Sequence, residues 1–146
     1  MRIVCGIDDS DGALRAARVA ADLARRLDAH LVVAIVVSPV LHVPPEGRTP
    51  GGGSDREALL ADRRERAGAV LARAARAAGV ADDADLKVLA GDAARVLIAE
   101  ARVDDDPALI VVGSRGQGAI RAAILGSVSS QLVRESPCPV VVVPAG

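Results

Sequence analysis

The fold is decided by the stretch Ile3-Val4-Cys5-Gly6-Ile7-Asp8-Asp9-Ser10-Asp11 near the start of the chain. A short apolar run that ends in a polar turn is typical of a strand buried on both faces of a parallel sheet. From residue 13 to residue 27 the apolar positions recur three and four apart, and charged residues fill the opposite side. This spacing predicts an amphipathic helix, so the chain begins as a strand followed by a helix.

The same alternation continues along the chain. Apolar runs predict further strands at residues 31–37, 86–90, 109–112 and 140–143. Helical spacing predicts helices at residues 55–78, after Asp92 as far as residue 101, and at residues 127–135, with Gly79 ending the first of these in the left-handed conformation. Apolar strands that alternate with helices indicate the α/β class, here a doubly wound parallel sheet with helices on both faces.

Composition limits the number of domains and the possible partners. The chain has 146 residues, 51% of them apolar and 25% charged, which suits one domain over residues 1–146. Lysine and arginine total 18 against 19 acidic residues, and Phe, Tyr and Trp are absent, so we expect no nucleic-acid partner. No apolar stretch approaches the roughly 18 residues that cross a bilayer, and the first residues show no signal-peptide pattern. We therefore expect a cytoplasmic protein without a membrane partner.

Two segments interrupt the regular pattern. Residues 38–54 contain four prolines and the run Gly51-Gly52-Gly53, which predicts a mobile loop, either a simple excursion or a lid over a site. We interpret Asp104-Asp105-Asp106 as a solvated turn, because consecutive carboxylates in a loop cannot all converge on one ion.

The cysteines Cys5 and Cys138 form no C-x-x-C motif and have no nearby histidine, so both are interpreted as small core residues.

A group of glycines and serines follows the predicted strand at residues 109–112. It consists of Gly113-Ser114-Arg115-Gly116, then nine residues, then Gly126-Ser127-Val128-Ser129-Ser130 at the start of the last helix. Glycines allow the backbone to approach a phosphate, and the first amides of a helix lack partners within the helix and attract anions. The plainer alternative is that these glycines only turn the chain. Neither a G-x-x-x-x-G-K-[ST] nor a G-x-G-x-x-G motif is present, which disfavours P-loop NTPases and dinucleotide dehydrogenases.

These residues carry a resemblance to a known family. The spacing Gly113-x2-Gly116-x9-Gly126-Ser127, with Asp8 closing the first strand and Ser136-Pro137-Cys138-Pro139-Val140 leading into the last, resembles the ATP-binding branch of the universal stress protein family. The resemblance implies a single five-stranded sheet in the order 3-2-1-4-5, a Rossmann-like three-layer sandwich. Its topological switch point would lie between strands one and four, where ligands of such sheets bind.

The resemblance also implies a role for individual residues. Asp8 would face the ribose or adenosine, the backbone around Val36 would meet adenine, and Gly113 would lie beside the ribose. The phosphates would be held by Gly116, Gly126, Ser127, Val128 and Ser129. Because the chain has no aromatic residue, we also expect aliphatic walls for adenine at Ile7 and Val112, and Arg115 is the cation that we expect to touch a nucleotide, although it could equally face solvent. Asp9 departs from the family pattern, and its carboxylate could repel phosphate unless it faces solvent or Mg²⁺.

Few residues suggest catalysis. Hydrolysis of a phosphoanhydride needs a positioned water and charge neutralisation, but Lys87 is the only lysine and lies in a strand, and His30 and His42 are interpreted as surface residues. We therefore assign no catalytic residue. The resemblance then implies a stress-response regulatory protein that binds ATP, with Mg²⁺ as the expected ion. One alternative is a slow ATP hydrolase, or a phosphotransferase that modifies its own Ser127 or Ser129. Another is a nucleotide-free interaction module with an unknown protein partner.

The last strand predicts an assembly. In the order 3-2-1-4-5 this strand, Val140, Val141, Val142 and Val143, lies at the edge of the sheet with unpaired amides and carbonyls. Only Pro144-Ala145-Gly146 follow it in this sequence, and Pro139 and Pro144 limit its length without covering its middle. Relatives in the family often dimerise through this region, and we expect a homodimer in which this strand pairs with its copy across a two-fold axis.

Overall fold

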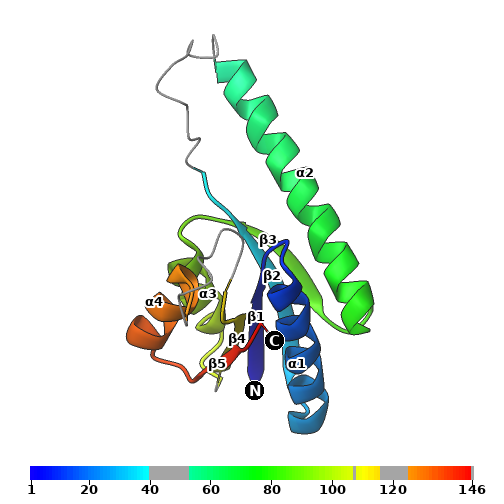
Figure 1. Cartoon of the computed structure of the whole chain (residues 1–146), viewed down its shortest axis with the longest axis vertical. Helices are drawn as coiled ribbons and strands as arrows, with labels where there is room; N and C mark the ends of the chain where they lie inside the picture. Colours follow the sequence, from blue (N-terminus) through cyan, green and yellow to red (C-terminus); the bar gives the residue numbers. More distant parts are fainter. Residues whose placement is uncertain (40–52, 107, 116–124, 146) are drawn as a thin grey trace.

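The computed structural model describes residues 1–39, 53–106, 108–115 and 125–145, which form a five-stranded parallel sheet covered on both faces by helices (Figure 1). The strands are β1 (Arg2–Ile7), β2 (His30–Val37), β3 (Asp85–Ala90), β4 (Ala108–Gly113) and β5 (Val140–Val143). The helices are α1 (Asp11–Leu27), α2 (Gly53–Ala78), α3 (Ala93–Ala101) and α4 (Ser127–Glu135). The strand order is β3-β2-β1-β4-β5, which confirms the order implied by the resemblance.

Alternating side chains of the central strand build two separate cores. Ile3 and Cys5 face α1 and α2, whereas Val4 faces α3 and α4. α1 contributes a stripe of small residues, Ala13, Ala16, Ala17, Ala20, Ala21 and Ala24, so it lies close to the sheet without any aromatic side chain. On the other face, a Cβ at Gly6 would lie only 2.5 Å from Leu97 Cδ1 of α3. Glycine at this position therefore allows Leu97 to pack directly on β1.

Several boundaries differ from the predictions because capping residues decide where a helix starts. α1 begins at Asp11 because Ser10 is its N-cap and accepts a hydrogen bond of 3.1 Å from the Ala13 N–H. α2 begins at Gly53, so the predicted mobile loop at residues 38–54 is too long at its end, and residues 40–52 lie outside the described part of the chain. Gly79 has a φ of +72°, which confirms the left-handed end of α2.

The two edge strands are more exposed than the predicted apolar runs suggest. In β3, which is the last strand at its end of the sheet, Leu86 and Val88 are each 37% exposed, although they pair with Val33 and Ile35 on the face that α1 and α2 cover. In β5, the first three valines are half-buried and only Val143 is buried. The expectation of strands buried on both faces holds for β1 and is wrong for these edges.

The amino-terminal half of α2 extends beyond the sheet (Figure 1). Residues 55–66 include no buried residue, whereas Ala67, Leu71 and Ala75 further along the helix are buried against the sheet. Among the described helices, none combines the length and the apolar character needed to span a bilayer.

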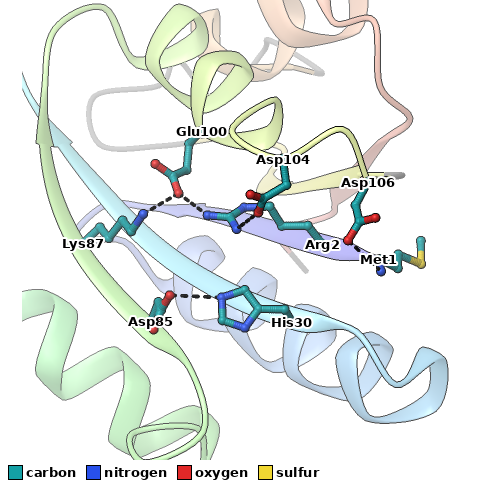
Figure 2. Close-up of polar contacts among 8 residues, drawn as sticks. All are labelled: Met1, Arg2, His30, Asp85, Lys87, Glu100, Asp104 and Asp106. Atoms are coloured by element: carbon teal, nitrogen blue, oxygen red, sulfur yellow. Dashed lines mark hydrogen bonds and ion pairs between the residues drawn. The ribbon is translucent and has the colours of Figure 1, made fainter.

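A network of ion pairs joins β1, β3 and the end of α3 (Figure 2). Glu100 Oε1 lies 2.6 Å from both Arg2 Nη2 and Lys87 Nζ, and Arg2 Nη1 lies 2.8 Å from Asp104 Oδ2. The amino group of Met1 lies 3.9 Å from Asp106. The predicted solvated turn at residues 104–106 is therefore exposed, as expected, but two of its three carboxylates pair with the start of the chain.

The two cysteines behave as small core residues. Cys5 is completely buried in β1, and burial raises the pKa of its thiol to about 12, so it stays protonated at neutral pH. Cys138 is half-buried and packs against the core on the α3 side.

Candidate functional site

The carboxyl ends of β1 and β4 lie side by side where the connections diverge. The two strands pair in parallel as far as Gly6 and Val112. After β1 the chain enters α1 on one face of the sheet, whereas the helix that follows β4 lies on the other face. This arrangement is the topological switch point of a doubly wound sheet, which is where ligands of this architecture bind.

The turn after β1 places two carboxylates at this edge. Asp8 is half-buried and accepts a hydrogen bond from the Ser10 hydroxyl. Asp9 is exposed and forms an ion pair with Arg73 of α2. The carboxylate that departs from the family pattern is therefore held by a cation from a distant part of the sequence.

Two glycines allow the first turn of α1 to touch the end of β4. A Cβ at Gly113 would lie 3.2 Å from both C and O of Gly12, and a Cβ at Gly12 would lie 3.2 Å from the Arg115 carbonyl oxygen. Such contacts are tighter than ordinary van der Waals packing, so a side chain at either position would push the two segments apart. The missing side chain of Gly113 is thus explained by protein packing, independently of any ligand.

Ser114 connects the end of β4 to the start of α4. Its carbonyl oxygen accepts from the Gly126 N–H at 2.6 Å and lies 3.1 Å from the Ser129 hydroxyl, while its own N–H donates to Val143 at 2.8 Å. Ser129 is only 2% exposed, and its hydroxyl also lies 3.1 Å from the Gly126 carbonyl oxygen. The Ser129 hydroxyl is therefore buried and bound to the main chain, which leaves the amide of this residue as the group available for the predicted phosphate contact.

The first turn of α4 offers main-chain amides at this edge. The Ser130 N–H donates to the Gly126 carbonyl at 3.0 Å, so the amides of Ser127, Val128 and Ser129 precede this helical bond. Gly126 is the N-cap and supplies no side-chain hydrogen bond. Ser127 is exposed and Val128 is half-buried. Amides of this kind, at the positive end of the helix dipole, suit an anion.

The expected adenine neighbours are only partly brought together. β2 pairs with β1 as far as Ile35 and with β3 as far as Val37, so at Val36 the strand has a sheet neighbour on one side. The side chains of Val36 and Val112 belong to the α3 side of the sheet. Ile7 is buried on the opposite side, in the core beneath α1, and does not join them.

The remaining predicted residues give a mixed outcome. Gly116 and His42 lie outside the described residues, and Arg115 is half-exposed at the end of the described loop. Lys87 is engaged with Glu100, and the ring of His30 lies 3.0 Å from Asp85 (Figure 2). Within the described ranges, no group of three or more His, Cys, Asp or Glu side chains is placed to hold a metal ion.

Two contributors to this edge were not predicted as such. Ser114 acts through its carbonyl oxygen, which every residue possesses. Its role could therefore not be predicted from the fact that it is a serine. Arg73 is one of many arginines on an amphipathic helix. The one feature of the sequence that could have indicated a role for Arg73 is the unusual Asp9, because a carboxylate at this position needs a counter-charge.

Comparison with known proteins identifies the family. A profile of the universal stress protein family (Usp) matches residues 1–144. The Thermus aquaticus protein named "universal stress protein in QAH/OAS sulfhydrylase 3′ region" is 38% identical over 141 residues, which cover 97% of this chain and 96% of that protein.

Solved structures share the fold. The universal stress protein UspA from Lactobacillus plantarum has a TM-score of 0.80 at 23% identity, and the match covers 98% of this chain and 97% of that chain. A universal stress protein in complex with cAMP has a TM-score of 0.68 at 26% identity, with 100% and 98% covered. Since the profile and the Thermus aquaticus relative each match nearly the full length, this chain belongs to the universal stress protein family.

Proposed function

We propose that the protein is a cytoplasmic, stress-response regulatory protein that binds ATP with Mg²⁺ at the carboxyl ends of β1 and β4. The observation that carries this proposal is the start of α4, where the amides of Ser127, Val128 and Ser129 precede the first helical bond at the switch point of the sheet. A family member with the same fold has been solved in complex with cAMP, which supports an adenine nucleotide as the ligand class.

Each part of the nucleotide has candidate partners. The α4 amides and the loop from Gly113 through Gly116 to Gly126 would hold the phosphates, with the Ser129 hydroxyl fixing the helix start rather than binding them. Asp8 would accept hydrogen bonds from the ribose, and the main chain at Val36 would contact adenine. Mg²⁺ would enter with the nucleotide, since this ion keeps phosphate oxygens and water among its ligands.

Gly126→Val tests the phosphate assignment. We expect ATP affinity to fall about 10–100-fold, the loss of one or two hydrogen bonds to a charged group, because a branched side chain would stand at the helix start. Gly126 has φ −75° and ψ 172°, which valine can adopt without backbone strain, and circular dichroism checks that the variant is folded. The measurement is calorimetric titration with MgATP, with Gly68→Val as the matched control, because a Cβ at Gly68 meets no atom within 4 Å.

Bound nucleotide is also visible directly. Because the chain contains no Trp or Tyr, an absorbance band near 260 nm in a preparation free of nucleic acid reports bound nucleotide. Unchanged ATP affinity in Gly126→Val would contradict the phosphate assignment, and the absence of both the band and any heat of binding would favour a nucleotide-free interaction module. Steady ATP turnover, or phosphate on the exposed Ser127, would replace the regulatory assignment with an enzymatic one.

We further propose a homodimer through the outer edge of β5. The Pro139 carbonyl accepts from Ile110 of β4 at 3.0 Å, and the Val143 carbonyl accepts from Ser114, directly after β4, at 2.8 Å. Main-chain groups alternate in direction along a parallel ladder, so those of Val141 also face β4. The main-chain groups of Val140 and Val142 therefore point outward. A second copy of this strand would pair with them.

Val142→Pro should give a monomer. Proline removes an outward N–H and leaves the pairing of Val141 with β4 in place, so the sheet of each subunit persists. Sedimentation equilibrium should report the dimer mass for the native protein and for the control Val142→Ala, which keeps the N–H. A dimer that survives Val142→Pro would place the interface elsewhere, and a native monomer at high micromolar concentration would exclude the assembly.

A further inference from the structure

We propose that Arg73 of α2 sets the charge selectivity of the nucleotide site by neutralising Asp9 at its entrance. The inference rests on the proposed function and concerns a residue that lies outside the glycine loop. Its starting point is the ion pair between Arg73 Nη2 and Asp9 Oδ1, which joins two residues 64 positions apart in the sequence.

A chain of contacts links this pair to the start of α4. Asp9 belongs to the turn between β1 and α1, and Gly12, in the first turn of α1, packs against the backbone of Gly113 and Arg115. The neighbouring Ser114 carbonyl holds the Gly126 N–H at 2.6 Å. The Asp9 carboxylate thus stands on the turn that borders the proposed phosphate site.

The sign of the charge at this turn decides which ligands are accepted. A second carboxylate beside Asp8 would repel a polyphosphate, whereas a carboxylate paired with a guanidinium contributes little net charge. Arginine suits this role because its guanidinium remains charged and reaches the carboxylate from a neighbouring helix. From the sequence alone, Asp9 could repel phosphate unless it faced solvent or Mg²⁺, and the structure shows a third outcome, an ion pair with Arg73.

The pair is exposed, and this exposure separates a role in binding from a role in stability. The Arg73 and Asp9 side chains are 66% and 53% exposed, and ion pairs of this kind add little to folding. Arg73 follows the buried Leu71 but is itself outside the core, so its truncation leaves the packing of α2 intact. A variant at this position should therefore fold normally.

Arg73→Ala should weaken ATP binding about tenfold in magnesium-free buffer of low ionic strength and AMP binding only about threefold, because the repulsion grows with the charge of the ligand. In about 1 M salt, where the screening length falls to about 3 Å, both losses should largely disappear. Asp9→Asn in the Arg73→Ala background should restore both affinities. Calorimetric titration of the full chain with ATP and with AMP measures these changes.

The matched control is Arg25→Ala. Arg25 is also exposed and paired, 3.3 Å from Asp22, but it lies in the last turn of α1, at the end of the helix away from this site. It changes the net charge equally and should leave both affinities unchanged. Equal losses for ATP and AMP, insensitivity to salt, or no rescue by Asp9→Asn would overturn the role of Arg73. Native protein that binds neither nucleotide would instead refute the proposed function itself.

Discussion

Glu100→Ala will lower the free energy of unfolding by about 3–5 kcal/mol, a large part of the total stability of a domain of this size. The Arg2 and Glu100 side chains are each only 9% exposed, so removing the carboxylate leaves the Arg2 guanidinium buried without its main counter-charge. Arg2 Nε is already buried with no hydrogen-bond partner among the described residues. The remaining partner, Asp104, is 58% exposed and compensates only weakly.

Urea unfolding followed by circular dichroism measures this loss, because the chain has no aromatic fluorophore. Glu135→Ala is the matched control, since Glu135 is exposed and its carboxylate lies 3.1 Å from Gln131 within α4. The triple variant Arg2→Met, Lys87→Met, Glu100→Leu should recover most of the stability, because an apolar cluster needs no counter-charge. A loss below about 1 kcal/mol in Glu100→Ala would show that the buried charges are not mutually dependent.

The same carboxylate predicts a pH dependence. Burial by itself would raise the pKa of Glu100, but hydrogen bonds and charge from Lys87 and Arg2 outweigh it and hold this pKa below its ordinary value of 4.5. A lowered pKa in the folded state means that the carboxylate stabilises the protein above about pH 4.5, and that this contribution is lost as the pH falls through the folded value. The difference in stability between the native protein and Glu100→Ala should therefore narrow in acid.

Gly91→Ala will cost about 2–4 kcal/mol of stability, from backbone strain together with overpacking. Gly91 has a φ of +140°, a region that side chains rarely adopt, and its N–H donates to the Val37 carbonyl at 3.1 Å. A Cβ there would lie 2.7 Å from Val96 Cγ2 of α3. Valine in a helix is stiff about χ1, so this methyl group cannot move aside easily.

Substitutions at two other glycines distinguish backbone strain from overpacking. Gly79 also has a positive φ, but a Cβ there meets no atom within 4 Å, so Gly79→Ala should cost about 1 kcal/mol through backbone strain alone. Gly68 lies inside α2 with open space around it, and Gly68→Ala should stabilise the protein by about 0.5–1 kcal/mol. If urea unfolding gave the same loss of unfolding free energy for Gly91→Ala and Gly79→Ala, the contact with Val96 would not contribute to the cost.

The arrangement of strands and helices was predictable because hydrophobic spacing reports which side of each segment is buried. Helix starts were less accurate, since the apolar spacing becomes visible at residue 13 while Ser10 decides where α1 begins. The buried network was not predictable from spacing at all. Arg2 and Lys87 belong to strands separated by β2, and only the order of the sheet brings both to Glu100.

The candidate site shows the same limit at the level of single groups. The start of α4 at Ser127 was predicted correctly, because a glycine followed by serines signals a helix start. The direction of the Ser129 hydroxyl was not, because a serine three residues after the N-cap can turn outward to a ligand or back to the main chain. The structure turns it back, toward the carbonyls of Gly126 and Ser114.

The central strand acquires its two neighbours at different times during synthesis. Ile3 of β1 pairs with Leu31 of β2 on one side and with Leu109 of β4 on the other. A ribosome that adds about 5–20 residues per second needs roughly 4–16 s to make the intervening 80 or so residues. Throughout this interval the nascent chain carries its central strand with one open edge. Since Gly113 ends β4, closure of that edge also brings this glycine against Gly12 at the start of α1.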